Sequence, residues 1–411
     1  MAFNNAVNEL GSAPIGSVAR YDFTAPTYSG WLECDGSAIS TTTYSGLYDV
    51  VGNSYEGTGN LTQVDQLSGE SNKGCLSVRW HPSSNYVAYG ESITGGGLGV
   101  ASFNGTTLTE VETINLSSES YCVDWHPDGD YLAVALYTGH TIKIYSWNGT
   151  DTLAEVESID TTYNCQYCGW HPDGDFLAVQ HSVGGTDELS IYSWNGTDTL
   201  SQVETVDVLA RNTIWSHSGD YLAICTAIAN SQLMIYSWNG SDTLTYVCKY
   251  DYSGTYAADA SWSLDDDFIA VGGSNDAKQL VVLSFNGTSL TERTSIDYGT
   301  SLRGHPMWSR GGNYLSNCIH GNTSTVDVVF LYSWVPSTYT LTEVDKIQMG
   351  RVGSFGADFN YTNNYIAYGC YFAESGAPYY KLYAGTTALT SCDYRTNFPL
   401  PTTADHLIRA K

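Results

Sequence analysis

Histidines recur at a fixed spacing in this sequence, and they are the side chains best suited to metal binding or proton transfer. His81, His126 and His171 each follow a tryptophan and precede a proline, at intervals of 45 residues. Equivalent places in successive structural repeats lie far apart in space, so these rings cannot converge on one ion or substrate. We therefore expect the three histidines to have a structural role in turns.

Acidic clusters and a cysteine pair also suggest chemistry, and their surroundings argue against it. Asp128-Gly129-Asp130 and Asp265-Asp266-Asp267 have no glutamate at calcium-loop spacing. Cys165 and Cys168 form a CxxC pair without the second pair that a zinc site needs. No nucleophile elbow, phosphate-binding loop or HExxH motif occurs. We expect no metal, no cofactor and no enzymatic activity.

The elements that carry these side chains are sequence repeats. The phrase WHPDGDYLAV has near copies down the chain, and a tryptophan opens six of them while a phenylalanine stands in the seventh. These aromatic anchors are Trp80, Trp125, Trp170, Trp215, Trp262, Trp308 and Phe359. Their spacing of 45 to 51 residues is close to the length of one four-stranded propeller blade.

Each unit contains four segments with strand character and two turn signals. In the second unit these are YCVDW, the turn HPDGD, YLAVAL, TIKIYSW, the turn NGTDT and LAEVESI. Proline, aspartate and glycine favour reversals, and Asn-Gly favours hairpins. One such sheet cannot bury its apolar faces alone, so neighbouring units must stack in a ring. LTQVDQL, residues 61–67, has the pattern of a fourth strand without its blade, and it could close the ring. ALTSCDY, from Ala388, is an alternative.

The unit resembles a WD-repeat propeller blade over residues 61–387, although YSWNG stands where that family has its Trp-Asp pair. This resemblance implies an all-β fold with a seven-bladed β-propeller over residues 61–394.

The composition of the chain limits the classes of molecule that it can bind. The 411 residues include 43 acidic and 16 basic side chains, for a net charge of −27. Phosphate binding needs clustered basic residues, so we expect no nucleic acid partner. No stretch of 18 apolar residues occurs, and the start lacks the features of a secretion signal, so we expect no membrane insertion. Most of the ten cysteines lie in strand-like runs, as buried reduced cysteines do.

Residues 14–60 contain none of the repeated phrases. They closely resemble the phage tail collar domain, a module of tail fibres and tail tips, in the pieces Pro14-Ile15-Gly16, Ala25-Pro26, Gly30 to Gly36, Tyr44 to Leu47 and Gly52 to Gly57. In that family a Phe-x-Leu-Pro strand soon follows. Here it occurs only at Phe398 to Pro401, and the chain ends ADHLIRAK, similar to the last strand of such proteins.

These observations predict a small, mainly β, collar-like domain that is split by the propeller. We expect a docking segment at residues 1–13, the first part of the collar-like domain at 14–60, the propeller at 61–394 and the second part of the collar-like domain at 395–411. Insertions of this kind survive at exposed loops whose ends stay close together.

One face of the propeller varies and the other repeats. The turns HPDGD and NGTDT share one face, and the remaining loops, which differ from blade to blade, share the other. Rigid scaffolds commonly carry binding residues on variable loops, although such a face can also be merely unconstrained. The candidate receptor-binding residues are Tyr137, His140, Tyr163, His181, Tyr252, Tyr256, Tyr298, Tyr371, Phe372 and Glu374.

The collar resemblance implies a phage virion protein that is made in the host cytoplasm and assembled into the tail. We expect a tail fibre or tail tip receptor-binding protein. Its partners would be other tail or fibre proteins and a host surface glycan or outer-membrane protein, and the resemblance implies a homotrimer. The alternatives are a structural tail adaptor without host contact, a propeller hydrolase acting on surface polysaccharide and a cellular scaffold.

Overall fold

The computed structural model contains β-strands joined by turns, and no helix occurs among the residues that it describes. The described residues are 18–20, 31–33, 38–40, 61, 63–67, 74–92, 97–161, 163–181, 189–226, 232–251, 256–274, 278–298, 303–320, 327–350, 357–361, 365–369, 397–399 and 406–409. Within these ranges, no helix of the length and hydrophobicity that a bilayer crossing requires was found.

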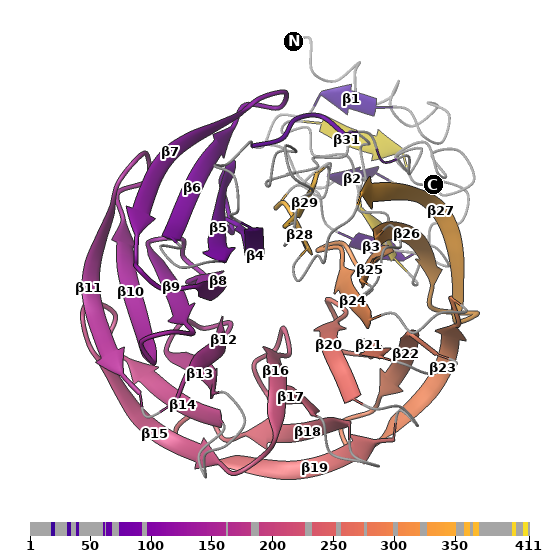
Figure 1. Ribbon diagram of the computed structural model, residues 1–411. Coiled ribbons are helices and arrows are strands. Elements are labelled where there is room, and N and C mark those ends of the chain that lie inside the picture. The colour runs from indigo at the N-terminus through magenta and orange to yellow at the C-terminus, as the bar shows by residue number, and fades with distance from the viewer. Residues whose placement is uncertain are drawn as a thin grey trace, which may run out of the picture.

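Six four-stranded antiparallel blades stand around a central axis (Figure 1). We call the strands of each blade a to d in chain order, from the axis outward. Blade 1 contains β4 (Gly74–Trp80), β5 (Tyr86–Ser92), β6 (Gly97–Phe103) and β7 (Leu108–Asn115). Blade 2 contains β8 (Ser120–Trp125), β9 (Tyr131–Leu136), β10 (Thr141–Trp147) and β11 (Leu153–Asp160). Blade 3 contains β12 (Cys165–Trp170), β13 (Phe176–His181), β14 (Leu189–Trp194) and β15 (Leu200–Val206).

The other three blades follow the same order. Blade 4 contains β16 (Ala210–Trp215), β17 (Tyr221–Thr226), β18 (Leu233–Trp238) and β19 (Leu244–Tyr250). Blade 5 contains β20 (Tyr256–Trp262), β21 (Phe268–Ser274), β22 (Leu280–Phe285) and β23 (Leu290–Ile296). Blade 6 contains β24 (Arg303–Trp308), β25 (Tyr314–His320), β26 (Asp327–Val335) and β27 (Thr340–Gly350). A single residue pair, Ser274 with Arg303, joins the sheets of blades 5 and 6.

Burial explains the sequence patterns of inner and outer strands. The b strand of blade 2, β9, is buried at every position after Tyr131, and its sequence is almost wholly apolar. The d strand, β11, alternates between exposed and more buried positions, as its mixture of Leu, Val and Ile with Glu and Ser predicts. The NGTDT turn between c and d is held by Asn148, whose side-chain oxygen accepts hydrogen bonds from three backbone N–H groups of residues 150–152.

The repeated histidines join neighbouring blades. His81 Nε2 donates to the Gly129 carbonyl oxygen at 3.1 Å, and its ring lies edge-on to Trp125 with centroids 4.9 Å apart. His171 makes the same pair of contacts with Gly219, at 3.0 Å, and with Trp215. The expected structural role of these residues is therefore confirmed, and it reaches across the interface between blades.

The prediction of seven blades is wrong for the part of the chain that the structure describes, because six four-stranded blades are present. The described part of the seventh repeat forms a two-stranded sheet of β28 (Ala357–Phe359) and β29 (Ile366–Tyr368). In blade 2 the Trp125 and Trp147 rings, on strands a and c, meet edge-to-face at 5.9 Å. The seventh repeat has Phe359 at the anchor position, and its sequence KLYAGTT, which lies outside the described residues, contains no tryptophan.

The two-stranded sheet nevertheless fills the space between blades 6 and 1. The Asp358 carboxylate accepts a hydrogen bond from Trp80 N at 2.7 Å, and Ala367 packs in the core of blade 1. Two residues that precede blade 1 contact outer strands: Leu61 N donates to Asp345 of β27, and Asp65 accepts from Leu108 N of β7. The described residues of the segment 61–67, which are 61 and 63–67, thus bridge the outer strands of the last and first four-stranded blades.

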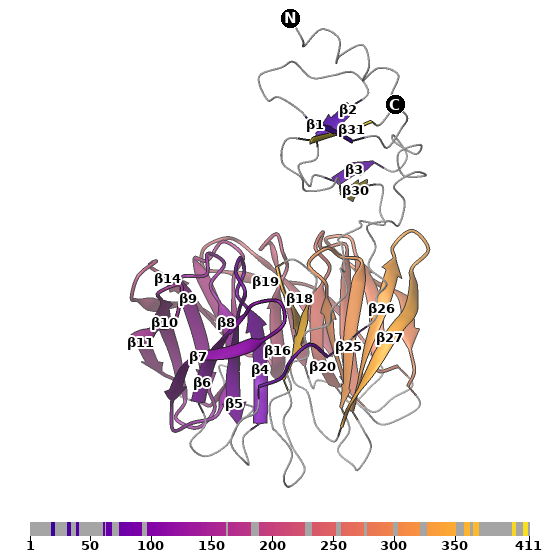
Figure 2. The same cartoon turned by 90° about the horizontal axis from the view of Figure 1, so that it is seen from above.

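Strands from the two ends of the chain pair with each other. β1 (Val18–Arg20) and β2 (Trp31–Glu33) both pair with β31 (His406–Arg409), and β3 (Ala38–Ser40) pairs with β30 (Asn397–Pro399). Figure 2 shows these two small sheets on one side of the propeller, beyond the hairpins that join β18 to β19 and β26 to β27. That side carries the a–b and c–d turns, so the variable loops face the opposite way.

Candidate functional site

Five of the ten candidate residues have described side chains. They are Tyr137, His140, Tyr163, His181 and Tyr298. Tyr256 begins β20, and its side chain is outside the described part of the chain. The other four, Tyr252, Tyr371, Phe372 and Glu374, lie outside the described residues.

Tyr163 and His181 come together in one cavity of about 320 Å³ between blades 2 and 3. Tyr163 belongs to the loop that leads from β11 to β12, and His181 ends β13. The described residues that line this cavity are Ile159, Asp160, Thr161, Tyr163, His181, Ser190, Tyr192, Leu200 and Gln202. We call it the blade 2–3 groove. Most of these residues carry polar groups, so the cavity suits a ligand rich in hydrogen-bonding groups.

The floor of the blade 2–3 groove is held by a hydrogen-bond chain. His181 Nε2 lies 3.2 Å from Ser190 Oγ, and Gln202 Nε2 donates to the same hydroxyl at 3.4 Å. His181 and Ser190 are buried, whereas Asp160 and Gln202 are exposed at the rim. Burial raises the pKa of the nearby Cys165 thiol to about 12, so this cysteine is not a nucleophile at neutral pH. The groove can therefore recognise a ligand through fixed polar groups.

Tyr137 and His140 lie in the b–c loop of blade 2. The Tyr137 ring stacks on Tyr121 with centroids 4.6 Å apart and planes inclined by 19°. His140 is exposed and has a left-handed backbone with φ of 56°, and its carbonyl accepts a hydrogen bond from Thr161 N. This bond connects the b–c loop of blade 2 to the loop that carries Tyr163.

Tyr298 packs against its neighbours. Its hydroxyl lies 2.9 Å from the Tyr332 hydroxyl and accepts a hydrogen bond from Asn317 Nδ2 at 3.0 Å. Burial raises its pKa to about 12. These contacts give Tyr298 a packing role between blades 5 and 6.

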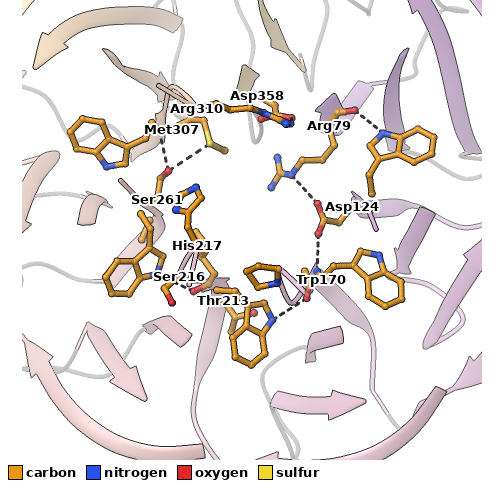
Figure 3. A pocket seen from close by; sticks show the side chains of 18 of the residues that line it. Arg79, Asp124, Trp170, Thr213, Ser216, His217, Ser261, Met307, Arg310 and Asp358 are labelled. Atoms are coloured by element: carbon orange, nitrogen blue, oxygen red, sulfur yellow. Dashed lines mark hydrogen bonds and ion pairs between the residues drawn. The ribbon is translucent and has the colours of Figure 1, made fainter. Parts of the chain in front are cut away.

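A second cavity, of about 480 Å³, occupies the central channel at the end where the a strands finish (Figure 3). Arg79 of blade 1 and Asp124 of blade 2 face each other there, with Nε and Oδ1 3.6 Å apart. Arg310 reaches across the two-stranded sector: it donates to the carbonyl oxygens of Phe359 and Pro82, each at 3.2 Å. The charged groups of the channel therefore join blades to each other.

Burial affects the protonation of two channel carboxylates, Asp124 and Asp358. It raises the pKa of Asp124 to about 6, and the positive charge of Arg79 offsets part of that increase. Burial also raises the pKa of Asp358, and Arg310 and Arg79 act in the opposite direction. Asp124 accepts a hydrogen bond from Trp170 N at 2.8 Å, as Asp358 does from Trp80 N. Each of these carboxylates therefore stabilises the contact with the strand that follows it around the ring.

Two hydrogen-bond arrangements attach the next blade at the residue before an anchoring tryptophan. Where this residue is Asp124, its carboxylate accepts a hydrogen bond from the backbone N–H of Trp170. Where it is Arg79, its carbonyl oxygen accepts from Trp125 Nε1 at 3.2 Å. The second arrangement recurs where this residue is Gly169 or Ile214. Sequence reasoning missed these channel residues, and the signal that could have found them is the variation at the position before each repeated tryptophan.

Among the described residues, no group of three or more His, Cys, Asp or Glu side chains is arranged to hold a metal ion. The acidic turn Asp128-Gly129-Asp130 instead supports its own backbone, because Asp130 N donates to Asp128 Oδ1.

Two family models match parts of the chain. The Phage Tail Collar Domain matches residues 16–64, and the WD domain, G-beta repeat matches residues 111–146. No curated protein matches the chain. The two resemblances noted in the sequence are thus each supported over part of its predicted extent.

Similar solved structures share the propeller at low sequence identity. A putative 6-phosphogluconolactonase from Bacteroides fragilis has a TM-score of 0.57 at 13% identity, over 67% of this chain and 85% of that one. The Myceliophteria thermophila Cps50 (Swd1) β-propeller domain has a TM-score of 0.58 at 10% identity, over 80% and 100%. Chaetomium thermophilum Sqt1, solved bound to the N-terminus of the ribosomal protein L10, has a TM-score of 0.55 at 13% identity, over 80% and 99%. At these identities the similarity shows the fold alone.

Proposed function

We propose that this protein is a component of a phage tail and that its propeller binds the host cell surface through the variable face. The observation that carries this proposal is the match of residues 16–64 to the Phage Tail Collar Domain, immediately before a propeller. A collar module suits attachment to a tail or fibre, and a propeller is a rigid scaffold for recognition loops.

The strand pairing supports a single collar-like domain built from both ends of the chain. Residues 14–60 supply β1, β2 and β3, and residues 395–411 supply their partners β31 and β30. In Figure 2 these strands lie on the side of the a–b and c–d turns. Docking through them would leave the opposite face, with Tyr137, His140, Tyr163 and His181, directed away from the tail.

The proposed partners are other tail or fibre proteins on the collar side, a homotrimeric arrangement of this chain, and a host glycan or outer-membrane protein on the variable side. The protein acts by binding, without catalysis. The channel carboxylates favour this assignment. Asp124 and Asp358 are each engaged by a backbone N–H and lie near an arginine. Asp259 accepts a hydrogen bond from Asn212, and its Oδ2 atom lies 3.4 Å from His305 Nδ1. A hydrolase would instead need an acid and a base free to reach a sugar.

A structural adaptor without host contact is the second candidate, because the collar match alone fits it equally well. The two differ in what the propeller does. A particle whose propeller has been deleted adsorbs normally if the protein is an adaptor, and it fails to adsorb if the variable face binds the receptor.

Immunogold labelling of intact particles tests the virion assignment. An antibody against residues 61–394 should label the far end of a tail or fibre in negative-stain electron micrographs. Tailed particles that carry no label, in a lysate where the same antibody detects the protein, would contradict the proposal and favour a cellular scaffold.

A further inference from the structure

Blade 3 differs from its neighbour at the place where the blade 2–3 groove opens. In blade 2, Lys143 of strand c and Glu155 of strand d form an ion pair, with Nζ and Oε2 2.7 Å apart. The aligned phrases TIKIYSW and ELSIYSW, and LAEV and LSQV, put Ser190 and Gln202 in these two places in blade 3. Two shorter or uncharged side chains therefore replace a long ion pair.

In three other blades a large group lies beside the residue that aligns with Glu155 or with Lys143. In blade 1 the Tyr89 hydroxyl donates to Glu110, and in blade 5 Lys278 Nζ lies 2.7 Å from Glu292 Oε1. In blade 6 Lys346 lies over the Phe330 ring, 5.5 Å from its centroid. Among the residues that the structure describes, blade 3 has the Ser190 hydroxyl and the Gln202 amide there, and these smaller groups explain why a cavity opens beside them.

The floor of the groove also changes from apolar to polar. Leu136 ends strand b of blade 2 and is buried, and the aligned residue of blade 3 is His181. Burying a histidine at a core position is unfavourable unless its ring nitrogens find partners. Ser190 supplies one such partner, at 3.2 Å. Three residues that differ from their counterparts in blade 2, His181, Ser190 and Gln202, thus line one cavity.

We infer that the blade 2–3 groove binds one residue of a neutral or amino-bearing glycan, an inference that rests on the proposed receptor-binding function and names its ligand. The cavity volume of about 320 Å³ is at the lower end of the range of ligand sites. Hydroxyl, imidazole and amide groups provide both donors and acceptors, as a sugar with several hydroxyls needs. Tyr163 and Tyr192 add ring surface beside these groups.

The charge of the lining residues determines which glycans the blade 2–3 groove can accept. Among the described lining residues, Asp160 alone carries a formal charge when histidine is neutral, and this charge is negative. The whole chain has a net charge of −27. An acidic sugar or a phosphate would therefore meet repulsion without a basic partner, whereas a hydroxyl or an ammonium group can be accommodated by the carboxylate.

The double variant Ser190→Lys/Gln202→Glu tests the inference by giving blade 3 the ion pair of blade 2. The variant is designed to fold because the same pair is already accommodated in the adjacent blade. The matched control, Lys143→Ser/Glu155→Gln, makes the reverse exchange in blade 2. Purified full-length proteins would be applied to immobilised neutral, N-acetylated, amino-bearing and acidic oligosaccharides, with thermal unfolding measured on each.

The parent and the control should bind neutral or amino-bearing oligosaccharides, and the double variant should bind them about tenfold or more weakly. Equal binding by parent and double variant, or preferred binding of acidic oligosaccharides, would overturn the inference. So would a parent that binds none of these glycans. Binding of the same proteins to host cells distinguishes the receptor function from the groove assignment. If the parent and the double variant bind cells equally, the receptor function stands and the groove assignment fails. If the parent binds no cells, the proposed function fails as well.

Discussion

His126 Nε2 donates a hydrogen bond to the carbonyl oxygen of Gly174, 48 residues later in the chain, at 3.0 Å. The same ring leaves no room for a side chain, because a Cβ atom on Gly174 would lie 2.3 Å from Nε2. Gly174 also has a φ of +84°, in the left-handed region that favours glycine. The histidine of one blade and the turn glycine of the next thus form one interlocking contact between blades.

Gly174→Ala should therefore destabilise the protein for two reasons, steric and conformational. The left-handed backbone alone costs about 1–2 kcal/mol in alanine, and displacement of the His126 ring adds about 1–3 kcal/mol. Gly196 has almost the same backbone, with φ of +83°, and a Cβ atom added there would have no other atom within 4 Å, so Gly196→Ala should show the conformational cost only. Urea unfolding gives the free energy of unfolding of each variant. Equal decreases for Gly174→Ala and Gly196→Ala would contradict the interlocking contact.

The stability of the protein should depend on pH through Asp124. The folded state raises the pKa of this carboxyl from its ordinary value of 3.8 to about 6, mainly by burial. At pH values between these two pKa values, Asp124 is protonated in the folded state and deprotonated in the unfolded chain. The contribution of Asp124 to stability is therefore greatest below pH 4 and is lost as the pH rises through about 6.

Asp124→Asn removes this titration and tests it directly. The free energy of unfolding of the variant, relative to that of the parent, should rise by an amount on the order of 2–3 kcal/mol between pH 4 and pH 7. Asp151→Asn is the matched control of opposite sign, since hydrogen bonds from Asn148, Thr152 and Thr150 lower the pKa of Asp151. Chemical denaturation at several pH values provides the measurement, and a stability difference independent of pH would refute the assignment.

Arg310 should be important for ring closure, because it donates to both Phe359 and Pro82 across the two-stranded sector. Arg310→Lys keeps the charge and loses the planar fork that makes both bonds, so we expect a loss of about 1–2 kcal/mol. Hydrogen exchange should quicken in β28 and β4 first. Arg293→Lys, on the exposed d strand of blade 5, is the control and should leave these strands unchanged.

The bridge made by residues 61–67 can be tested at Asp65. Asp65→Ala removes the acceptor for Leu108 N, and we expect proteolysis to increase near residues 61–67. Glu157 accepts the equivalent bond from Leu200 N inside the ring of blades. Glu157→Ala should cost a similar hydrogen bond of about 1 kcal/mol without exposing a chain segment. Identical proteolysis of the two variants would show that residues 61–67 do not close the ring.

Much of the propeller could be predicted because its signals are local. The Asn-Gly turns, the alternation of the d strands and the tryptophan spacing each depend on a few adjacent residues, and they recur. The number of complete blades could not be predicted, because closure depends on contacts such as Trp80 with Asp358, 278 residues apart. Such distant pairs leave no local pattern.

The candidate site was predictable in part. Tyr163 lies in a variable loop and His181 ends the strand before one, and the structure brings them into one cavity. Ser190 and Gln202 were missed because they occupy ordinary strand positions, where serine and glutamine fit the alternation of the blade. Their significance emerges only from comparison with Lys143 and Glu155, whose ion pair fills the equivalent place in blade 2.

The most direct test of the central claim is competition for adsorption. Host cells would be incubated with the purified full-length protein before particles are added, and the unadsorbed particles would be counted. We predict that the protein inhibits adsorption in a saturable manner and that antibody against residues 61–394 abolishes this inhibition. Folded protein that neither binds the cells nor reduces adsorption at any concentration would contradict a receptor-binding propeller.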